Sequence, residues 1–147
     1  MSGIVCAIRG GPDSRPTINK AISLAAETDQ CIYFLYVVNL DFLTHTQSSR
    51  IHSINAEMRQ MGELILLSAQ TTAASKNVEA QGVVRQGNVG EEIVGLCHEV
   101  KASYVILGTP QSETEENIFS IQRLNTFRER LESETGAKVI LVGGETE

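Results

Sequence analysis

The chain has 147 residues, of which 41% are hydrophobic and 20% charged, a composition typical of one globular domain rather than of a disordered protein. Its formal net charge of -6 disfavours a nucleic-acid partner, because phosphate backbones repel a negative protein. The longest apolar run is about half the length that spans a bilayer, and the amino terminus lacks a signal-peptide pattern, so we expect a cytoplasmic protein without membrane contact.

The first half of the chain predicts two strands, each followed by a helix. Residues 3–8 (GIVCAI) and 31–38 (CIYFLYVV) are apolar runs rich in β-branched and aromatic residues, which indicates strands covered on both faces. After Ser14, a residue suited to a helix cap, apolar residues recur at helical spacing. They are Ile18, Ala21, Ile22, Ala25 and Ala26. The longest helix is expected at about 49–74, with an apolar stripe widened by Leu64 and Leu67. Its other members are Ile51, Ile54, Met58, Met61 and Ile65.

The second half predicts three further strands and two helices. Residues 78–85 alternate in polarity around an internal glycine, which favours a strand near an edge, while 104–107 and 138–142 are continuous apolar runs. Asn88 and Glu91 match a capping box before a helix. The apolar face of that helix is Ile93, Leu96, Cys97 and Val100. The last helix is expected to begin at Thr126, with Glu129 completing its capping pattern, and to end at Gly136. Phe127 and Leu131 are its expected inward residues.

Residues with catalytic or metal-binding chemistry are sparse. Cys6, Cys31 and Cys97 are odd in number, are not spaced for metal binding and lie in apolar runs, so we expect all three in the core. The three histidines are not spaced with cysteines or carboxylates as metal ligands, and no Ser/His/Asp arrangement is visible. No catalytic residue and no metal site is assigned.

The alternation of strands and helices indicates one parallel sheet with helices on both faces, a doubly wound α/β architecture. In such sheets ligands bind beyond the carboxyl ends of the strands, where successive connections leave to opposite faces. The candidate site therefore lies after the first and fourth strands, in the loops at 9–13 and 108–126.

Several segments together carry a family resemblance. They are AIRGGPDS at 7–14, Gly87, EEIV at 91–94, ASYVILG at 102–108 and VILV at 139–142. Their order and spacing resemble the universal stress protein family over essentially the whole chain. The resemblance implies a single domain spanning 1–147 with a three-layer Rossmann-like sandwich of the adenine nucleotide alpha hydrolase-like class. It also implies a five-stranded parallel sheet of order 3-2-1-4-5 and a homodimer joined through the last strand, from Val139 to Val142.

The loop that binds ATP in such relatives is altered here. Family members that bind ATP resemble one another in Gly-x2-Gly-x9-Gly-Ser/Thr after the fourth strand. Gly108 matches the first glycine, Gln111 replaces the second, and counting back from the last strand places Asn125 and Thr126 at the final pair. Where nucleotide-binding relatives resemble one another in an aspartate at the end of the first strand, this chain has Arg9.

The loop chemistry opposes a triphosphate. Pro110 offers no N–H donor, and Gln111 could occupy the space that phosphates need. Four nearby acidic residues would repel ATP unless a divalent ion such as Mg²⁺ intervened. They are Glu113, Glu115, Glu116 and Glu129. Arg9 either binds a phosphate or another anion, or is an exposed arginine at the strand end, or is neutralised by Glu113 to Glu116.

The resemblance implies a noncatalytic regulatory or stress-response domain with a degenerate adenine-nucleotide site, whose ligand is AMP, ATP with Mg²⁺, another small anion, or none. The expected ligand contacts are Ala7, Ile8, Arg9, Gly10, Val38, Gly108, Thr109, Gln111, Asn125 and Thr126. Two other functions remain open. The sequence GGPDS at 10–14 is similar to the loop of PP-loop ATP pyrophosphatases, which would make the protein an ATP-using enzyme. Alternatively, the protein is a scaffold whose segment 112–122 binds a partner through Ile118 and Phe119.

Overall fold

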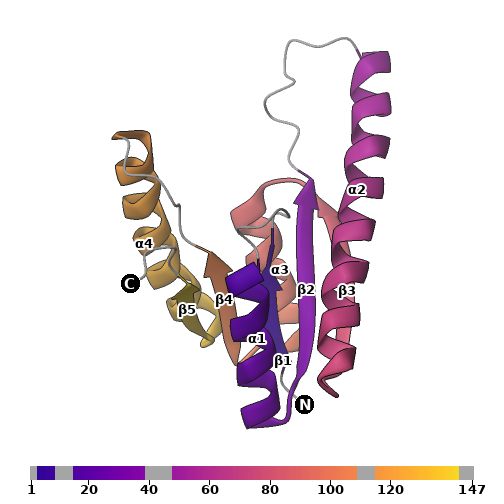
Figure 1. Ribbon diagram of the computed structural model, residues 1–147. Helices are drawn as coiled ribbons and strands as arrows, with labels where there is room; N and C mark the ends of the chain where they lie inside the picture. The colour runs from indigo at the N-terminus through magenta and orange to yellow at the C-terminus, as the bar shows by residue number, and fades with distance from the viewer. Residues whose placement is uncertain (1–2, 9–14, 39–47, 109–114, 143–147) are drawn as a thin grey trace.

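The computed structural model describes residues 3–8, 15–38, 48–108 and 115–142; for 48–52 and 115–124 it describes the backbone. Five strands form one parallel sheet in the order β3-β2-β1-β4-β5 (Figure 1). The strands are β1 Gly3–Ala7, β2 Cys31–Val38, β3 Ala80–Gln86, β4 Tyr104–Gly108 and β5 Lys138–Val142. The predicted sheet order is therefore confirmed, and the more polar strand β3 lies at an edge, as expected.

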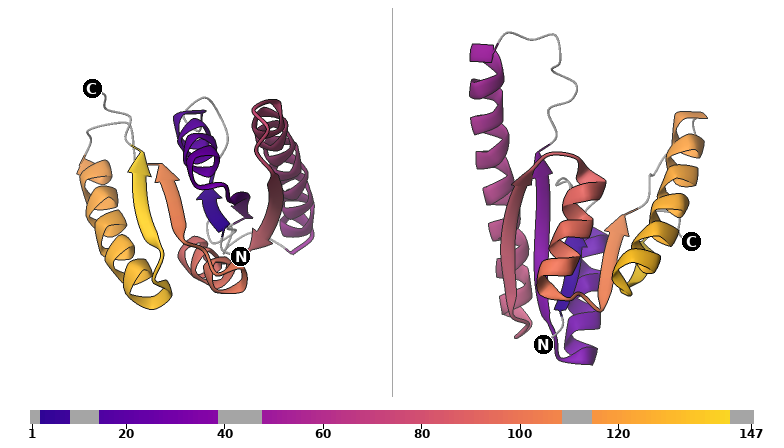
Figure 2. Two further views of the ribbon diagram at one scale, coloured as in Figure 1. Left: turned by 90° about the horizontal axis from the view of Figure 1, so that it is seen from below. Right: turned by 180° about the vertical axis from the view of Figure 1, so that it is seen from behind.

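Four helices cover the two faces of the sheet (Figure 2). They are α1 Arg15–Thr28, α2 Ser48–Ser75, α3 Val89–Val100 and α4 Glu115–Thr135. Buried residues of α1 and α2 pack on one face of the sheet, and those of α3 and α4 pack on the other. Because the first two crossovers cover one face of the sheet and the last two cover the other, the chain forms a doubly wound three-layer sandwich.

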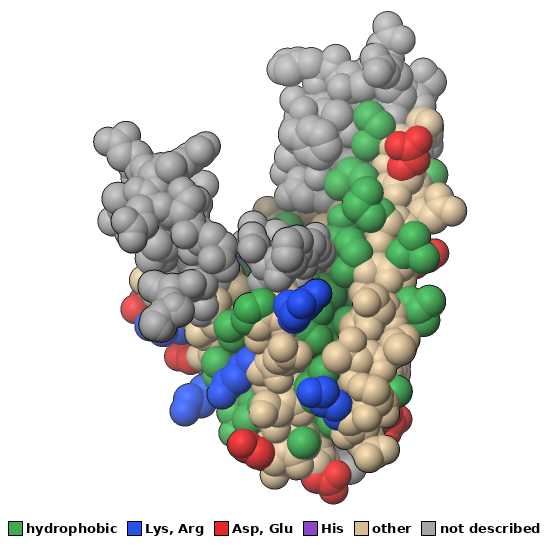
Figure 3. All heavy atoms as spheres, viewed as in Figure 1, with side chains coloured by type: hydrophobic (Ala, Val, Ile, Leu, Met, Phe, Trp, Pro, Cys, Tyr) green, Lys and Arg blue, Asp and Glu red, His purple; other side chains and the backbone are tan. Residues whose placement is uncertain are grey.

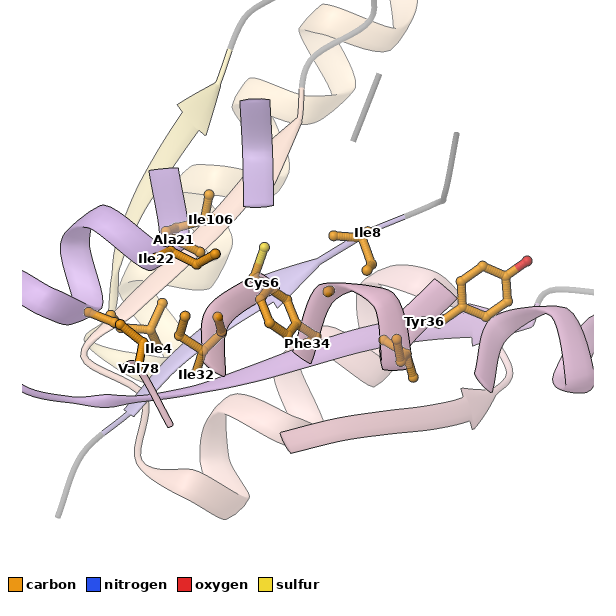
Figure 4. Packing of buried hydrophobic residues seen from close by; sticks show 14 of the residues in the cluster. Ile4, Cys6, Ile8, Ala21, Ile22, Ile32, Phe34, Tyr36, Val78 and Ile106 are labelled. Carbon is orange, nitrogen blue, oxygen red and sulfur yellow. The ribbon is translucent and has the colours of Figure 1, made fainter. Parts of the chain in front are cut away.

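Helix α1 packs closely on the sheet. Ile4, Cys6, Ile32 and Phe34 of the two central strands are fully buried there, beneath the α1 alanines 21 and 25 (Figure 4). Small side chains let the helix axis approach the sheet. The α1 stripe differs from the expectation at one position: Ala26 is exposed, and Thr17 is buried in line with the alanines at intervals of four residues. The expected cap Ser14 lies outside the described residues.

The apolar face of α2 was assigned partly to the wrong side. Leu66, Ala69 and Ala73 are buried against the sheet, at 3%, 1% and 0% exposure. Met61, Leu64 and Leu67 are instead 55%, 65% and 59% exposed, and Figure 3 shows apolar side chains gathered along this helix. Four consecutive apolar residues, 64–67, give the helix apolar positions on every side, so periodicity alone does not select the buried one.

The ends of α3 follow the sequence expectation in part. The side-chain oxygen of Asn88 accepts a hydrogen bond from the Glu91 amide at 3.0 Å, as a cap should. The Glu91 carboxylate pairs with Arg130 of α4 at 3.1 Å rather than completing the capping box. The helix ends at Lys101, which adopts the left-handed conformation with φ 54°. The described ion pair therefore joins α3 to α4.

The start of α4 corrects the sequence analysis. The helix begins at Glu115, eleven residues before Thr126, and ends before Gly136, whose φ is 77°. The end was predicted correctly, but the start was not. A Thr-x-x-Glu pattern is a local signal only, whereas no glycine or proline interrupts 111–135, so the helix continues through it. From Glu115 onward, the segment 112–122 is the beginning of this helix and not a separate insertion.

Two of the three cysteines lie in the core as expected. Cys6 and Cys97 are 0% and 1% exposed, and Cys31 is partly exposed at the start of β2, which corrects the third assignment. Burial raises the pKa of the Cys97 thiol to about 12 and that of Cys6 further. Both thiols therefore stay protonated at neutral pH and behave as apolar side chains.

Candidate functional site

The carboxyl ends of the central strands lie side by side. Cys6 pairs in register with both Phe34 and Ile106, so Ile8, two residues further on, stands level with Tyr36 and Gly108. The Ile8 amide donates to the Leu35 carbonyl at 2.9 Å. Strand β1 leads to α1 on one face and β4 to α4 on the other, so this is the topological switch point of the sheet.

Four expected ligand residues are brought together at this edge. Ala7 ends β1 and Ile8 follows it, Gly108 ends β4, and Val38 ends β2 two residues beyond the level of Ile8. The Val38 carbonyl accepts a hydrogen bond from the Gly87 amide at 3.0 Å, which ties the end of β2 to the start of α3. Ile8 and Val38 are 5% and 0% exposed, so their side chains form the apolar base of the edge.

Gly108 is in close contact with the first turn of α1. A methyl group at this position would lie 3.0 Å from Oγ1 of Thr17, which is tighter than ordinary van der Waals contact. The Cys6 thiol also donates weakly to the Thr17 carbonyl at 3.9 Å. Glycine therefore lets β4 end directly against the amino-terminal turn of α1, where backbone N–H groups favour anions. Sequence reasoning missed Thr17, although its spacing to Ala21 and Ala25 was a visible signal.

A second wall of the edge comes from α2. The ring of Tyr36 packs on Gly62, where a methyl group would lie 2.8 Å from its Cε2 atom. Met58, one turn earlier in α2, packs partly buried against the same core cluster. In Figure 4 the Tyr36 hydroxyl points away from the other labelled side chains. Tyr36 was read only as a strand residue in the sequence, because a hydroxyl in an apolar run gives no periodic signal.

The remaining expected ligand residues are not all placed at this edge. Arg9, Gly10, Thr109 and Gln111 lie outside the described residues. Asn125 and Thr126 are exposed and lie inside α4, about three turns from its first residue. Their amides are therefore helix-interior groups, and the expectation that they form a helix-start phosphate site is wrong.

Two described arginines near α3 are committed to carboxylates. Arg85 of β3 contacts Glu99 at 2.6 Å and Glu92 at 3.8 Å, and its hydrogen bond to Glu99 lowers the pKa of that carboxyl group. Arg130 contacts Glu91 at 3.1 Å and Glu134 at 2.9 Å. Arg15, the first residue of α1, forms no ion pair within the part of the chain that the structure describes. It is therefore the described cation best placed for an anion at the start of α1.

The described residues hold no group of three or more His, Cys, Asp or Glu side chains arranged for a metal ion. None of the helices in the described ranges is long and apolar enough to cross a membrane.

A doubly wound parallel sheet with a switch point between β1 and β4 defines the class of Rossmann-like α/β domains. The family model of the universal stress protein family matches residues 1–121, and the chain belongs to that family. The resemblance seen in the sequence is thereby confirmed. No curated protein sequence matches the chain.

Solved structures agree on the fold. The universal stress protein UspA from Lactobacillus plantarum superposes with a TM-score of 0.76 at 10% identity, over 96% of this chain and 97% of that one. The universal stress protein from Archaeoglobus fulgidus in complex with dAMP gives 0.63 at 15% identity, over 97% and 98%. A universal stress protein in complex with cAMP gives 0.66 at 17% identity, over 96% of each chain. At such identities the likeness shows the fold.

Proposed function

We propose that this chain is a noncatalytic regulatory domain that binds an adenine mononucleotide beyond the carboxyl ends of β1, β2 and β4. The observation that carries the proposal is the contact of Gly108 with Thr17, which places the end of β4 directly against the amino-terminal turn of α1. Two proteins of the same fold were solved with dAMP and with cAMP, both adenine mononucleotides. In this chain the start of α1 is suited to a phosphate and the apolar side chains at the strand ends are suited to a base.

The base side of the proposed site is apolar. Ile8 and Val38 are buried at the strand ends, and Tyr36 and Met58 continue the surface toward α2. A purine ring can pack against such side chains and bury its own apolar faces there. The phosphate would lie toward the start of α1, near Arg15, with Arg9 as a second cation at the end of β1.

The phosphate side favours one phosphate over three. Helix α4 starts with Glu115 and Glu116, so acidic residues occupy the helix start that follows β4. Negative side chains at a helix amino terminus compete with a bound anion for the same N–H groups. Pro110 removes one further donor from the connecting loop. The β- and γ-phosphates of ATP would therefore meet repulsion that AMP avoids.

The nucleotide proposal predicts a preference that calorimetry can measure. We expect AMP to bind at least about tenfold more tightly than ATP without Mg²⁺, since one charge pair in partly exposed surroundings contributes on the order of 1 kcal/mol or more. Mass analysis of the denatured protein should release AMP or no nucleotide. Stoichiometric copurified ATP, or equal affinity for ATP and AMP, would contradict the preference, and absence of any nucleotide binding would refute the proposed site.

We further propose that a second copy of the chain pairs with β5. The Lys138 amide donates to the Ser103 carbonyl on the β4 side at 3.0 Å, so the backbone groups of Val139 and Leu141 face the outer edge. The Val139 amide is covered by Glu132 of α4 at 3.0 Å, while no partner of the Leu141 amide is found in the described residues. An edge that is only half covered by its own chain is a natural surface for a twofold partner.

Light scattering at micromolar concentration tests the pairing. We expect twice the mass of the 16.0 kDa chain, since strand pairing along β5 would satisfy the remaining edge groups. A clean monomer would show that Glu132 and the residues after β5 cover the edge without a partner. Binding of AMP by such a monomer would leave the nucleotide proposal intact.

The described residues do not support either of the two other hypotheses. The GGPDS sequence of the PP-loop hypothesis lies at 10–14, outside the described residues. The scaffold hypothesis placed its partner-binding lid at 112–122, most of which belongs to the regular helix α4.

A further inference from the structure

The hydroxyl group of Tyr36 is the polar tip of a side chain that is otherwise buried. Tyr36 is 8% exposed, and its ring packs on Gly62 of α2. The hydroxyl has no hydrogen-bond partner within the part of the chain that the structure describes. In that same part, a fully covered side-chain oxygen without a partner occurs only at Asn55. The Tyr36 oxygen therefore keeps some of the exposed area of its residue and is open to a ligand.

The strand register places Tyr36 among the side chains of the proposed base surface. Cys6 pairs with Phe34, so Ile8 stands level with Tyr36 on the neighbouring strand, about 5 Å away between Cα atoms. Val38 lies about 7 Å beyond Tyr36 along β2, and its side chain points to the same face because side chains alternate along a strand. The side chains of Ile8, Tyr36 and Val38 belong to one buried cluster.

The Tyr36 hydroxyl lies on the side of the carboxyl ends of the strands. In Figure 4 the labelled residues Ile32, Phe34 and Tyr36 follow one another from left to right, which gives the direction of β2. The hydroxyl points further to the right than any other labelled side chain. Because the ring packs on Gly62, this polar tip lies at the α2 side of the edge where the ligand is proposed to bind.

The orientation of a nucleotide at this edge follows from its two ends. Helix α1 packs on β1 and β4, whereas α2 packs on β2 and β3. In a purine nucleotide the ribose is attached to the five-membered ring, so the six-membered ring lies furthest from the phosphate. A nucleotide whose phosphate lies near Arg15, at the start of α1, therefore directs its six-membered ring toward β2 and α2. The Tyr36 hydroxyl lies on that side.

We propose that the Tyr36 hydroxyl forms a hydrogen bond with the six-membered ring edge of the bound adenine. The inference rests on the proposed nucleotide function and adds the residue that recognises the base. A tyrosine hydroxyl both donates and accepts hydrogen bonds, and this edge of adenine carries an amino donor and ring-nitrogen acceptors. A base without polar groups on this edge would gain no hydrogen bond from the hydroxyl.

Two tyrosine-to-phenylalanine variants test the inference. Tyr36→Phe removes the hydroxyl and keeps the ring that packs on Gly62. Tyr104→Phe is the matched control, because Tyr104 begins β4 level with Ile4, at the opposite end of the sheet. The melting temperature of ligand-free Tyr36→Phe should equal that of wild type, since the lost hydroxyl has no partner among the described residues.

Calorimetry with two ligands measures the contact. The ligands are AMP and benzimidazole riboside 5′-monophosphate, which keeps the fused rings, the ribose and the phosphate but has no polar group on its six-membered ring. We expect wild type and Tyr104→Phe to bind AMP about 3- to 10-fold more tightly than the benzimidazole nucleotide, as one neutral hydrogen bond would cause. Tyr36→Phe should lose this preference, with weaker AMP binding and unchanged affinity for the benzimidazole nucleotide.

Four outcomes would overturn the inference while the nucleotide site stands. They are equal affinity of wild type for the two ligands, AMP binding by Tyr36→Phe that is as tight as in wild type or tighter, equal weakening of both ligands in Tyr36→Phe, and a lower melting temperature of this variant. Equal weakening would mean that the hydroxyl contacts the ribose or the phosphate, and a lower melting temperature would mean a structural role. Failure of wild type to bind either ligand would overturn the proposed function itself.

Discussion

The Leu66→Ala variant is expected to lose about 2–5 kcal/mol of unfolding free energy, and Leu67→Ala less than about 0.5 kcal/mol. The two leucines are neighbours on α2, yet Leu66 is 3% exposed and Leu67 is 59% exposed. Truncation of Leu66 removes buried methyl groups from the core cluster and leaves a cavity beside the sheet. Truncation of Leu67 removes side-chain surface that is already in water.

Urea unfolding followed by circular dichroism measures both losses of unfolding free energy. Both variants replace leucine by alanine in the same helix, so the change in helix propensity is the same for the two. The difference between the two losses shows which face of α2 is buried and distinguishes it from the apolar stripe that periodicity suggested. Equal losses for the two variants would mean that Leu67 is also covered, for example by a second copy of the chain. A protein-concentration dependence of the Leu67→Ala loss would then distinguish that case.

The second prediction concerns two glycines in helix interiors that should respond to alanine with opposite signs. Gly62→Ala is expected to destabilise the protein by about 1–3 kcal/mol, because the new methyl group would overlap the buried ring of Tyr36. Gly95→Ala is expected to stabilise it by about 0.5–1 kcal/mol, since no atom lies within 4 Å of the new methyl group and alanine favours the helix. Thermal and urea unfolding of both variants checks the signs.

A double-mutant cycle with Tyr36→Leu identifies the cause of the Gly62 effect. If the ring is the obstacle, Gly62→Ala should cost less in the Tyr36→Leu background than in wild type. The same loss in both backgrounds would place the strain elsewhere in α2. Because Tyr36 also borders the proposed base site, AMP binding should weaken in the Gly62→Ala variant more than in Gly95→Ala, whose site lies in α3.

How far the site could be predicted from sequence depended on the kind of residue. The sequence predicted that Ile8, Val38 and Gly108 lie at one edge, because the carboxyl ends of parallel strands meet there, and the structure places the three residues together. The contact of Tyr36 with α2 was missed because Tyr36 belongs to a segment read for its apolar pattern, where a single hydroxyl gives no signal. This contact arises only from the packing of α2 across β2.

The placement of α4 shows the limit of a local pattern. Thr126 and Glu129 match a capping box, but a capping box competes with continuation of the helix, and the uninterrupted segment before Thr126 continues from Glu115. The helix start expected at Asn125 and Thr126 was wrong for this reason. The end of the same helix was correct, because Gly136 adopts a positive φ that other residues avoid.

The sequence by itself determined the architecture: its apolar runs and helical periods alternate, this alternation permits a parallel doubly wound sheet, and the family resemblance supplied the strand order. Each of these properties depends on local period and short-range pattern, which are present in the chain before it folds. Only the tertiary structure decided which side of α2 is buried, where α4 begins, and that Thr17 lies against the end of β4. These depend on contacts between segments distant in sequence, where Gly62 meets Tyr36 and Gly108 meets Thr17, and no local pattern encodes such contacts.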